Sequence, residues 1–187
     1  MLFASSGKAF TLDVARLPGG RGAGEPVRLM ADMDVADAIV ALMVHVPGRR
    51  LIVASSDGYG FVVPEDDCLA TTRKGKQVLN VKLPAETQAC VVIPDGADHV
   101  AVVGENRKLL VFALSELPEM SRGRGVRLQK YRDGGLSDIR AFRLADGLSW
   151  RDSSGRTWTA DVREWVGARA QSGRLPPKGF PRSNRFG

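Results

Sequence analysis

The chain has 187 residues, enough for one domain with a substantial core or for two small domains. Its composition, 43% hydrophobic and 26% charged, is typical of globular proteins and argues against wholesale disorder. The 27 Lys and Arg against 21 Asp and Glu give a net charge of +6, which favours a polyanionic partner without requiring one.

The positive charge is concentrated in the second half of the chain. Cations minus acids amount to +1 over residues 1–50, −3 over 51–99, +3 over 100–147 and +5 over 148–187. Any surface that binds a polyanion is therefore expected mainly on the later segments.

Several functional classes lack their sequence signals. No run approaches the roughly 18 apolar residues of a membrane span, and the start of the chain lacks the features of a secretory signal. Cys68 and Cys90 have no zinc-binding spacing, so we expect two reduced core thiols in a cytoplasmic protein. No P-loop, dinucleotide motif or catalytic triad is visible, so we expect no cofactor, metal or catalytic residue in this chain.

Four segments align with one another in chain order. They are Leu2–Gly24, Leu51–Lys76, Val100–Gly125 and, more weakly, Leu148–Arg174. Two columns recur at intervals of 48 to 51 residues, an apolar column of Phe10, Phe61, Leu110 and Trp158 and a glycine column of Gly24, Gly75, Gly125 and Gly173.

Each aligned unit predicts about four short strands. An apolar strand enters a polar turn such as Ser6-Gly7 or Asp57-Gly58, and a second strand leads to a basic, glycine-rich stretch. Strand-like runs then follow at 26–32, 77–83 and 126–131, and others close the units at 38–46, 89–94 and 139–145. The run at 38–46 also suits a buried helix.

A period near 50 residues with four strands predicts an all-β, propeller-like array with repeats near 2–50, 51–99, 100–147 and 148–174. The alternative is a β-sandwich with chance similarity between hairpins. Because residue 1 falls within a hairpin, we expect a further blade upstream. We expect 175–187, with three prolines and four cations from Arg174 onward, to form an extended, partly disordered tail.

Four stretches of the chain carry a family resemblance. They are FASSGKAFTLDVARLPGGRGAGEPVRLM (3–30), VASSDGYGFVVPEDD (53–67), TRKGKQVLNVK (72–82) and VAVVGENRKLLVFALSELPEMSRGRGVRLQKYRDGG (100–135). With them the chain, from residue 2 to about 186, resembles the C-terminal domains of the ParC proteins of DNA topoisomerase IV, which are related to the C-terminal domains of DNA gyrase A.

The resemblance implies a β-pinwheel, in which neighbouring four-stranded blades exchange strands and a basic outer rim binds and bends duplex DNA. It also implies partners, namely the catalytic core of ParC and the second protein of the topoisomerase IV enzyme, with ATP and Mg²⁺ used on other domains. The gyrase box Q-R-R-G-G-K-G is only approximated by PGGRGAG (18–24), TRKGK (72–76) and SRGRGVR (121–127). This departure favours topoisomerase IV, a decatenating and relaxing enzyme, over gyrase-like wrapping.

The basic glycine stretches suit the binding of phosphates. Arg offers a planar fork and Lys a point charge, while glycine lets the backbone come close. The predicted DNA-binding residues are, in order of strength, Arg122, Arg124, Arg127, Lys130, Arg132, Arg73, Lys74, Lys76, Arg21, Arg28 and Lys8, with Arg107 and Lys108 as an extension. Tyr131 is a candidate for packing on a sugar.

Other interpretations of the charge remain open at this point. Each basic loop could be a solvated hairpin, and the array could be a protein-interaction module with no role on DNA. The recurrence of cations at one column favours a DNA surface, and the absence of a recognition helix predicts contacts to the backbone.

Overall fold

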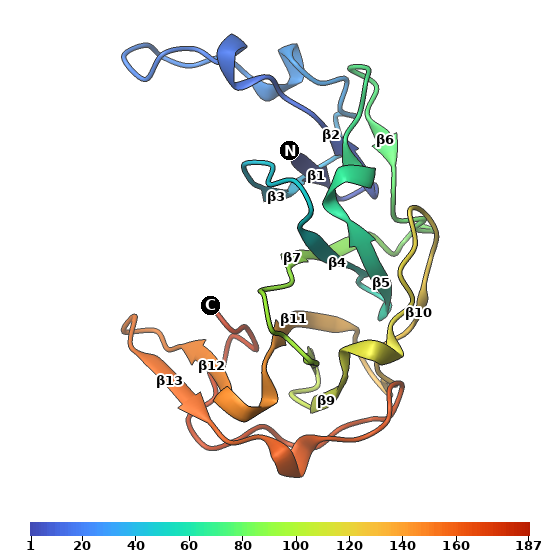
Figure 1. The fold of residues 1–187 in the computed structure, drawn as a ribbon, viewed down its shortest axis with the longest axis vertical. Helices are drawn as coiled ribbons and strands as arrows, with labels where there is room; N and C mark the ends of the chain where they lie inside the picture. Colours follow the sequence, from blue (N-terminus) through green and yellow to red (C-terminus); the bar gives the residue numbers. More distant parts are fainter.

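The structure, a computed structural model, describes residues 1–187 as short antiparallel strands joined by turns (Figure 1). The only helical segments are single 3-10 turns: η1 (Val14–Arg16), η2 (Val27–Leu29), η3 (Glu65–Cys68), η4 (Leu114–Glu116), η5 (Leu144–Asp146) and η6 (Arg163–Trp165). None of them has the length or apolar character needed to cross a membrane. The all-β prediction is confirmed.

The strands form four separate sheets, which we call blades 1 to 4. Blade 1 has the order β3-β1-β2-β6, with β3 (Ile39–Leu42), β1 (Leu2–Ala4), β2 (Lys8–Phe10) and β6 (Lys76–Gln77). Blade 2 has the order β10-β5-β4-β7, with β10 (Val126–Arg127), β5 (Tyr59–Pro64), β4 (Arg50–Ser55) and β7 (Thr87–Val92).

The two later blades contain fewer regular strands. Blade 3 has the order β11-β8-β9, with β11 (Leu136–Phe142), β8 (His99–Gly104) and β9 (Leu109–Ala113). Blade 4 is the hairpin of β12 (Leu148–Arg151) and β13 (Thr157–Ala160). The blades lie along an open arc, with a gap between the first and the last (Figure 1).

Neighbouring blades exchange their outermost strands. β6 belongs to the second sequence unit but pairs with β2 of blade 1, and β10 belongs to the third unit but pairs with β5 of blade 2. The fourth unit continues the pattern, because Val166 and Arg174 form isolated bridges to Val111 and Leu109 of blade 3. This exchange is the β-pinwheel that the resemblance implied.

The apolar runs of the central strands are continuous because both faces of each central blade are covered. Along β4, Leu51 and Val53 face the core shared with blade 1, while Ile52 and Ala54 face the core shared with blade 3. Side chains alternate between the two faces of a strand, so each residue serves one core or the other. The molecule is therefore held together by a row of cores between blades.

The glycine column provides the backbone conformation needed for strand exchange. Gly75, Gly125 and Gly173 have φ of +75°, +81° and +78°, in the left-handed region that favours glycine. A Cβ on Gly125 would collide with the carbonyl oxygen of Gly60 on the preceding blade, and a Cβ on Gly173 would lie 2.5 Å from that of Leu109. The column thus marks the points where each exchanged segment meets its neighbour.

Replacing Gly125 with alanine should weaken the attachment of β10 to blade 2. The φ of +81° alone costs a residue with a side chain about 1–3 kcal/mol, and the collision with Gly60 adds to this. Gly22, which has no atom within 4 Å of a Cβ position, is the matched control. Urea unfolding should show a clear loss of stability for Gly125→Ala and almost none for Gly22→Ala; equal midpoints would contradict this role of the column.

Two expectations about local structure are settled differently. Residues 38–46 contain the strand β3 and no helix, so the strand alternative is confirmed. The strand expected at 26–32 is wrong, because Val27–Leu29 forms a 3-10 turn. No strand of the described chain lies beside this segment to pair with it, and Gly24 has the φ of its column, +74°, but no neighbouring atom near its Cβ position.

The C-terminal residues also need a correction, because they pack on blades 3 and 4. Phe180 and Phe186 are 5% and 1% exposed and join the core around Trp150, whose ring lies 5.5 Å from that of Phe180. The backbone N–H of Arg151 donates to the carbonyl of Phe186. We call residues 179–187 the C-terminal strap; the expectation of a partly disordered tail rested on prolines and charge and overlooked these two aromatic anchors.

Candidate nucleic-acid interface

The strongest predicted loop, 121–127, is fixed to the outer edge of blade 2. The N–H of Gly123 donates to the carbonyl of Val78, and its own carbonyl accepts from the N–H of Asn80, at 3.0 and 2.8 Å. The loop then enters β10, which pairs with Tyr59 and Gly60. The glycines therefore attach this loop to two neighbouring segments at once and leave its arginines exposed.

Two of these arginines share one aromatic ring that the sequence did not identify. The guanidinium of Arg124 lies 3.7 Å from the centre of the Tyr59 ring, and that of Arg127 lies 5.5 Å from it. Arg127 also donates to the hydroxyl of Tyr59 at 3.0 Å, and Arg124 pairs with Asp57 at 3.3 Å. Cation–π contacts of this kind orient guanidinium groups while leaving N–H donors available.

Arg122 and the cations that follow the loop are held more loosely. Arg122 contacts the side-chain oxygen of Asn80 only at 3.5 Å. The backbone of Lys130 is fixed by a hydrogen bond to Gln171, but its side chain is exposed, as is that of Arg132. These three side chains are free to meet a ligand from solvent.

The basic segments of successive units lie side by side along the outer edge. Leu79, just after β6, bridges Gly123 of the next unit. In the same way Leu128 and Lys130, just after β10, form backbone hydrogen bonds with Ala170 and Gln171 of the following unit. Cations from three units therefore occupy one continuous strip, which we call the basic rim.

The second unit contributes two free cations to the rim and one that is engaged. Lys74 and Lys76 are exposed. Arg73 donates to the carbonyl of Leu29 and lies 3.7 Å from the carboxylate of Asp32, so it fastens the long loop of the first unit to blade 1.

The predicted residues of the first unit do not gather at one place. Arg21 is exposed in the loop that projects from blade 1, and Arg28 donates to the carbonyls of Val35 and Asp37 within the same loop. Lys8 is half-buried on β2 opposite Gln77. Only Lys8 adjoins the rim through β6.

In the third unit, Arg107 and Lys108 have different surroundings. Arg107 donates to the carbonyls of Pro181 and Phe180 and to the side chain of Asn184, so its guanidinium holds the C-terminal strap. Lys108 is exposed next to it. The sequence could not reveal the task of Arg107, because its partners lie more than 70 residues away.

Tyr131 occupies a junction between blades and not the surface. Its ring packs against Gly58 and Gly104, where a Cβ would come within 2.5 and 2.9 Å of it, and it joins the core between blades 2 and 3. Burial raises the pKa of its hydroxyl. The aromatic residue beside the basic loop is thus Tyr59, and Arg169, which donates to the carbonyl of Arg127 at 2.7 Å, is a further cation that the sequence did not single out.

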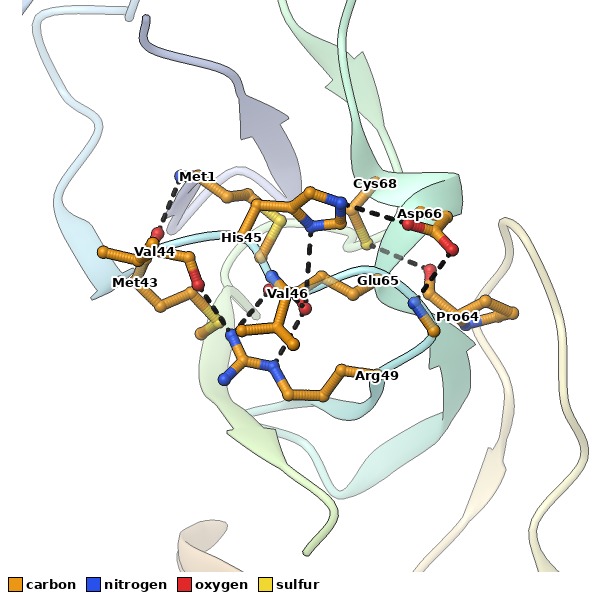
Figure 2. Close-up of polar contacts among 11 residues, drawn as sticks. Met1, Met43, Val44, His45, Val46, Arg49, Pro64, Glu65, Asp66 and Cys68 are labelled. Atoms are coloured by element: carbon orange, nitrogen blue, oxygen red, sulfur yellow. Dashed lines mark hydrogen bonds and ion pairs between the residues drawn. The ribbon is translucent and has the colours of Figure 1, made fainter. Parts of the chain in front are cut away.

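A buried ionic network joins blades 1 and 2 away from the rim, as Figure 2 shows. Glu65 is fully buried and accepts two hydrogen bonds from Arg49, at 2.9 and 2.8 Å, and one from the N–H of Val46. The ring of His45 lies between this carboxylate and that of Asp66, at 3.6 and 3.1 Å. Burial would raise the pKa of Glu65, but the hydrogen bonds and the charge of Arg49 more than offset it, and the pKa is lowered.

The two cysteines lie in the core between blades 1 and 2 and are not bonded to each other, as expected of core thiols. Burial raises the pKa of Cys68 to about 12 and raises that of Cys90 as well, so both remain protonated at neutral pH. Nowhere in the 187 described residues do three or more His, Cys, Asp or Glu side chains gather as metal ligands would.

Comparison with a family model supports the assignment of the fold. Residues 49–91 and 98–141 match the model described as the DNA gyrase C-terminal domain, a beta-propeller. These ranges cover most of the second and third sequence units, including the loop 121–127.

Curated relatives agree with this match. The chain is 46% identical over its whole length to the DNA topoisomerase 4 protein (the A subunit of that enzyme) of Caulobacter vibrioides, and 30% identical over 78% of its length to that of Escherichia coli K12. It spans 24% and 19% of these relatives, about a quarter of their length or less.

Among solved structures, the E. coli ParC C-terminal domain superposes with a TM-score of 0.82 at 25% identity, covering 97% of this chain and 77% of that one. A DNA gyrase A C-terminal domain superposes with a TM-score of 0.69 at 10% identity, over 92% of this chain and 58% of that one, which supports the fold alone. The chain belongs to the family of C-terminal β-pinwheel domains found in the A subunits of topoisomerase IV and gyrase.

Proposed function

We propose that this chain binds duplex DNA along its basic rim as the non-catalytic C-terminal domain of a type IIA topoisomerase. The observation that carries the proposal is the continuous strip of cations from three sequence units, centred on Arg124 and Arg127 above Tyr59. Guanidinium groups and exposed lysines suit phosphates, and no helix is available to read bases in a groove.

The proposed mode of binding includes bending. The blades lie along an arc (Figure 1), so a duplex that contacts the rim on two or three blades has to follow its curvature. Bending a site of 20–30 base pairs costs of the order of 1–6 kcal/mol, which several phosphate contacts together can offset. The preference among sequences would then follow the deformability of the DNA.

Within a complete enzyme, the domain would position DNA segments for strand passage during decatenation and the relaxation of supercoils. Its partners would be duplex DNA, the catalytic core of ParC and the second protein of the topoisomerase IV enzyme. ATP and Mg²⁺ would act on those other domains, because the rim offers cations and no set of metal ligands.

A triple substitution tests the proposal. Arg122, Arg124 and Arg127 changed together to alanine should weaken the binding of a duplex of roughly 30 base pairs by tenfold or more at low salt, because three phosphate contacts are lost. The matched control replaces Arg16, Arg143 and Arg163, which are also exposed and remove the same charge. Fluorescence anisotropy measures both; equal affinities for the two variants would refute a rim-centred site.

A further inference from the structure

A second cationic site lies outside the residues that the rim uses. A cavity of about 870 Å³ opens between the β12–β13 turn and the C-terminal strap, and Arg151, Arg182 and Arg185 line it. We propose that this cavity binds phosphate groups of the duplex and so extends the DNA path from the rim onto blade 4. This inference rests on the proposed function and adds a site to it.

The arginines of the cavity have no acidic partner. Its one acidic side chain, Asp152, accepts hydrogen bonds from Ser154, Arg156 and Trp158 within its own turn. The side-chain hydrogen bonds from Ser154 and Trp158 lower the pKa of Asp152 to about 2. None of the ion pairs of the described chain includes the three arginines, so their donors are available to an anion from solvent.

The strap holds two of these arginines in place. Arg182 and Arg185 lie between the buried anchors Phe180 and Phe186. Between the anchors, Asn184 has a φ of +56°, accepts a hydrogen bond from Arg107 and has its carbonyl bonded to the hydroxyl of Ser137. Backbone that is already ordered costs less entropy when its side chains bind, so the site is better prepared than a free basic tail.

The lining favours a phosphate backbone over an acidic peptide. Around the arginines it consists of serine, proline and glycine, including Gly155 and Gly179, and it contains no large apolar side chain. A peptide would find no pocket there for an anchoring residue, whereas Arg forks match phosphate oxygens.

The cavity also adjoins the surface already proposed for DNA. Arg107, in the hairpin turn of blade 3, donates directly to Pro181 of the strap, and the exposed Lys108 follows it in the chain. A duplex leaving the rim at blade 3 therefore meets the cavity next. A short duplex would occupy the rim alone, and a longer one would reach both.

The experiment compares the chain with Arg151, Arg182 and Arg185 changed to alanine against the Arg16, Arg143 and Arg163 control. With a duplex of roughly 40 base pairs, the variant should bind about tenfold more weakly than the control, and its log–log salt slope should fall by about two to three. With roughly 15 base pairs the two should bind alike. A photo-crosslinker on Ser183→Cys should label the longer duplex.

The outcomes separate this inference from the proposed function. If the longer duplex binds the variant and the control equally, while the change of Arg122, Arg124 and Arg127 still weakens binding, the cavity is no DNA site and the rim stands. If the unmodified chain binds no duplex, the proposed function fails first. Cavity-dependent binding of a poly-glutamate peptide, with no effect on duplex, would overturn the inference in favour of a protein ligand.

Discussion

Replacing Arg49 with methionine is expected to destabilise the chain by about 3–5 kcal/mol, the usual effect of removing one partner from a buried ion pair. Glu65 has no exposed surface, and Arg49 supplies two of its three hydrogen bonds. Without the guanidinium, the carboxylate would have to remain charged in the core without its partner, or take up a proton at a pH well above its ordinary pKa.

The matched control changes both partners, Arg49→Met and Glu65→Leu, and so removes the charge together with its counterion. This double variant should recover most of the lost stability, because apolar replacements of a buried pair are often neutral. Urea unfolding at neutral pH measures both proteins. If Arg49→Met is as stable as the parent chain, the network does not hold the junction between blades 1 and 2.

The same network predicts a dependence on pH. Because the folded state lowers the pKa of Glu65, its ionised form contributes stability that is fully present above the ordinary glutamate pKa of about 4.3. That contribution is lost as the pH falls through the lower, folded-state pKa. The stability difference between the parent chain and Glu65→Gln should therefore be constant from about pH 7 to 5.5 and shrink below about pH 4; a difference independent of pH would contradict the ionised pair.

Replacing Phe186 with alanine is expected to cost about 3–5 kcal/mol, as for other large aromatic side chains removed from a core. Its ring is 1% exposed and lies 5.5 Å from that of Phe180, which in turn packs on Trp150. The substitution opens a cavity in the core between blades 3 and 4 and frees the end of the strap.

The neighbouring Arg185 provides the control for this change. Arg185→Ala removes a side chain from the same segment without touching the core, so its unfolding midpoint should stay close to that of the parent chain. Intrinsic tryptophan fluorescence reports the change directly, since Phe186→Ala should expose Trp150. An unchanged midpoint for Phe186→Ala would mean that the C-terminal strap adds nothing to the stability of blades 3 and 4.

The fold could be predicted from the sequence because its determinants recur. The glycine column needs a left-handed backbone at the same place in each unit, and the apolar strands between the columns repeat with it. Strand exchange was a different matter, because spacing alone assigns a segment such as 126–131 to its own unit. Only the resemblance implied that β10 completes blade 2, since the partner strand lies more than 60 residues earlier.

The candidate site was predictable in its charge but less so in its geometry. The loop 121–127 could be identified from its arginines and glycines, yet Tyr59, the ring beneath two of them, comes from another unit. Tyr131 is adjacent in sequence and turns into a core. Sequence proximity cannot tell which of two tyrosines faces solvent when the neighbouring blade decides it.

The salt dependence of duplex binding tests the central claim, that a strip of cations on consecutive blades holds DNA by its phosphates. Anisotropy of a labelled duplex of roughly 30 base pairs, repeated between about 50 and 200 mM salt, gives a log–log slope of roughly −0.9 for each phosphate neutralised. We expect a slope of about −4 or steeper for the parent chain, and one shallower by about 2 to 3 for the Arg122, Arg124 and Arg127 variant. A folded chain whose binding is absent, or whose slope is the same in that variant, would contradict the account.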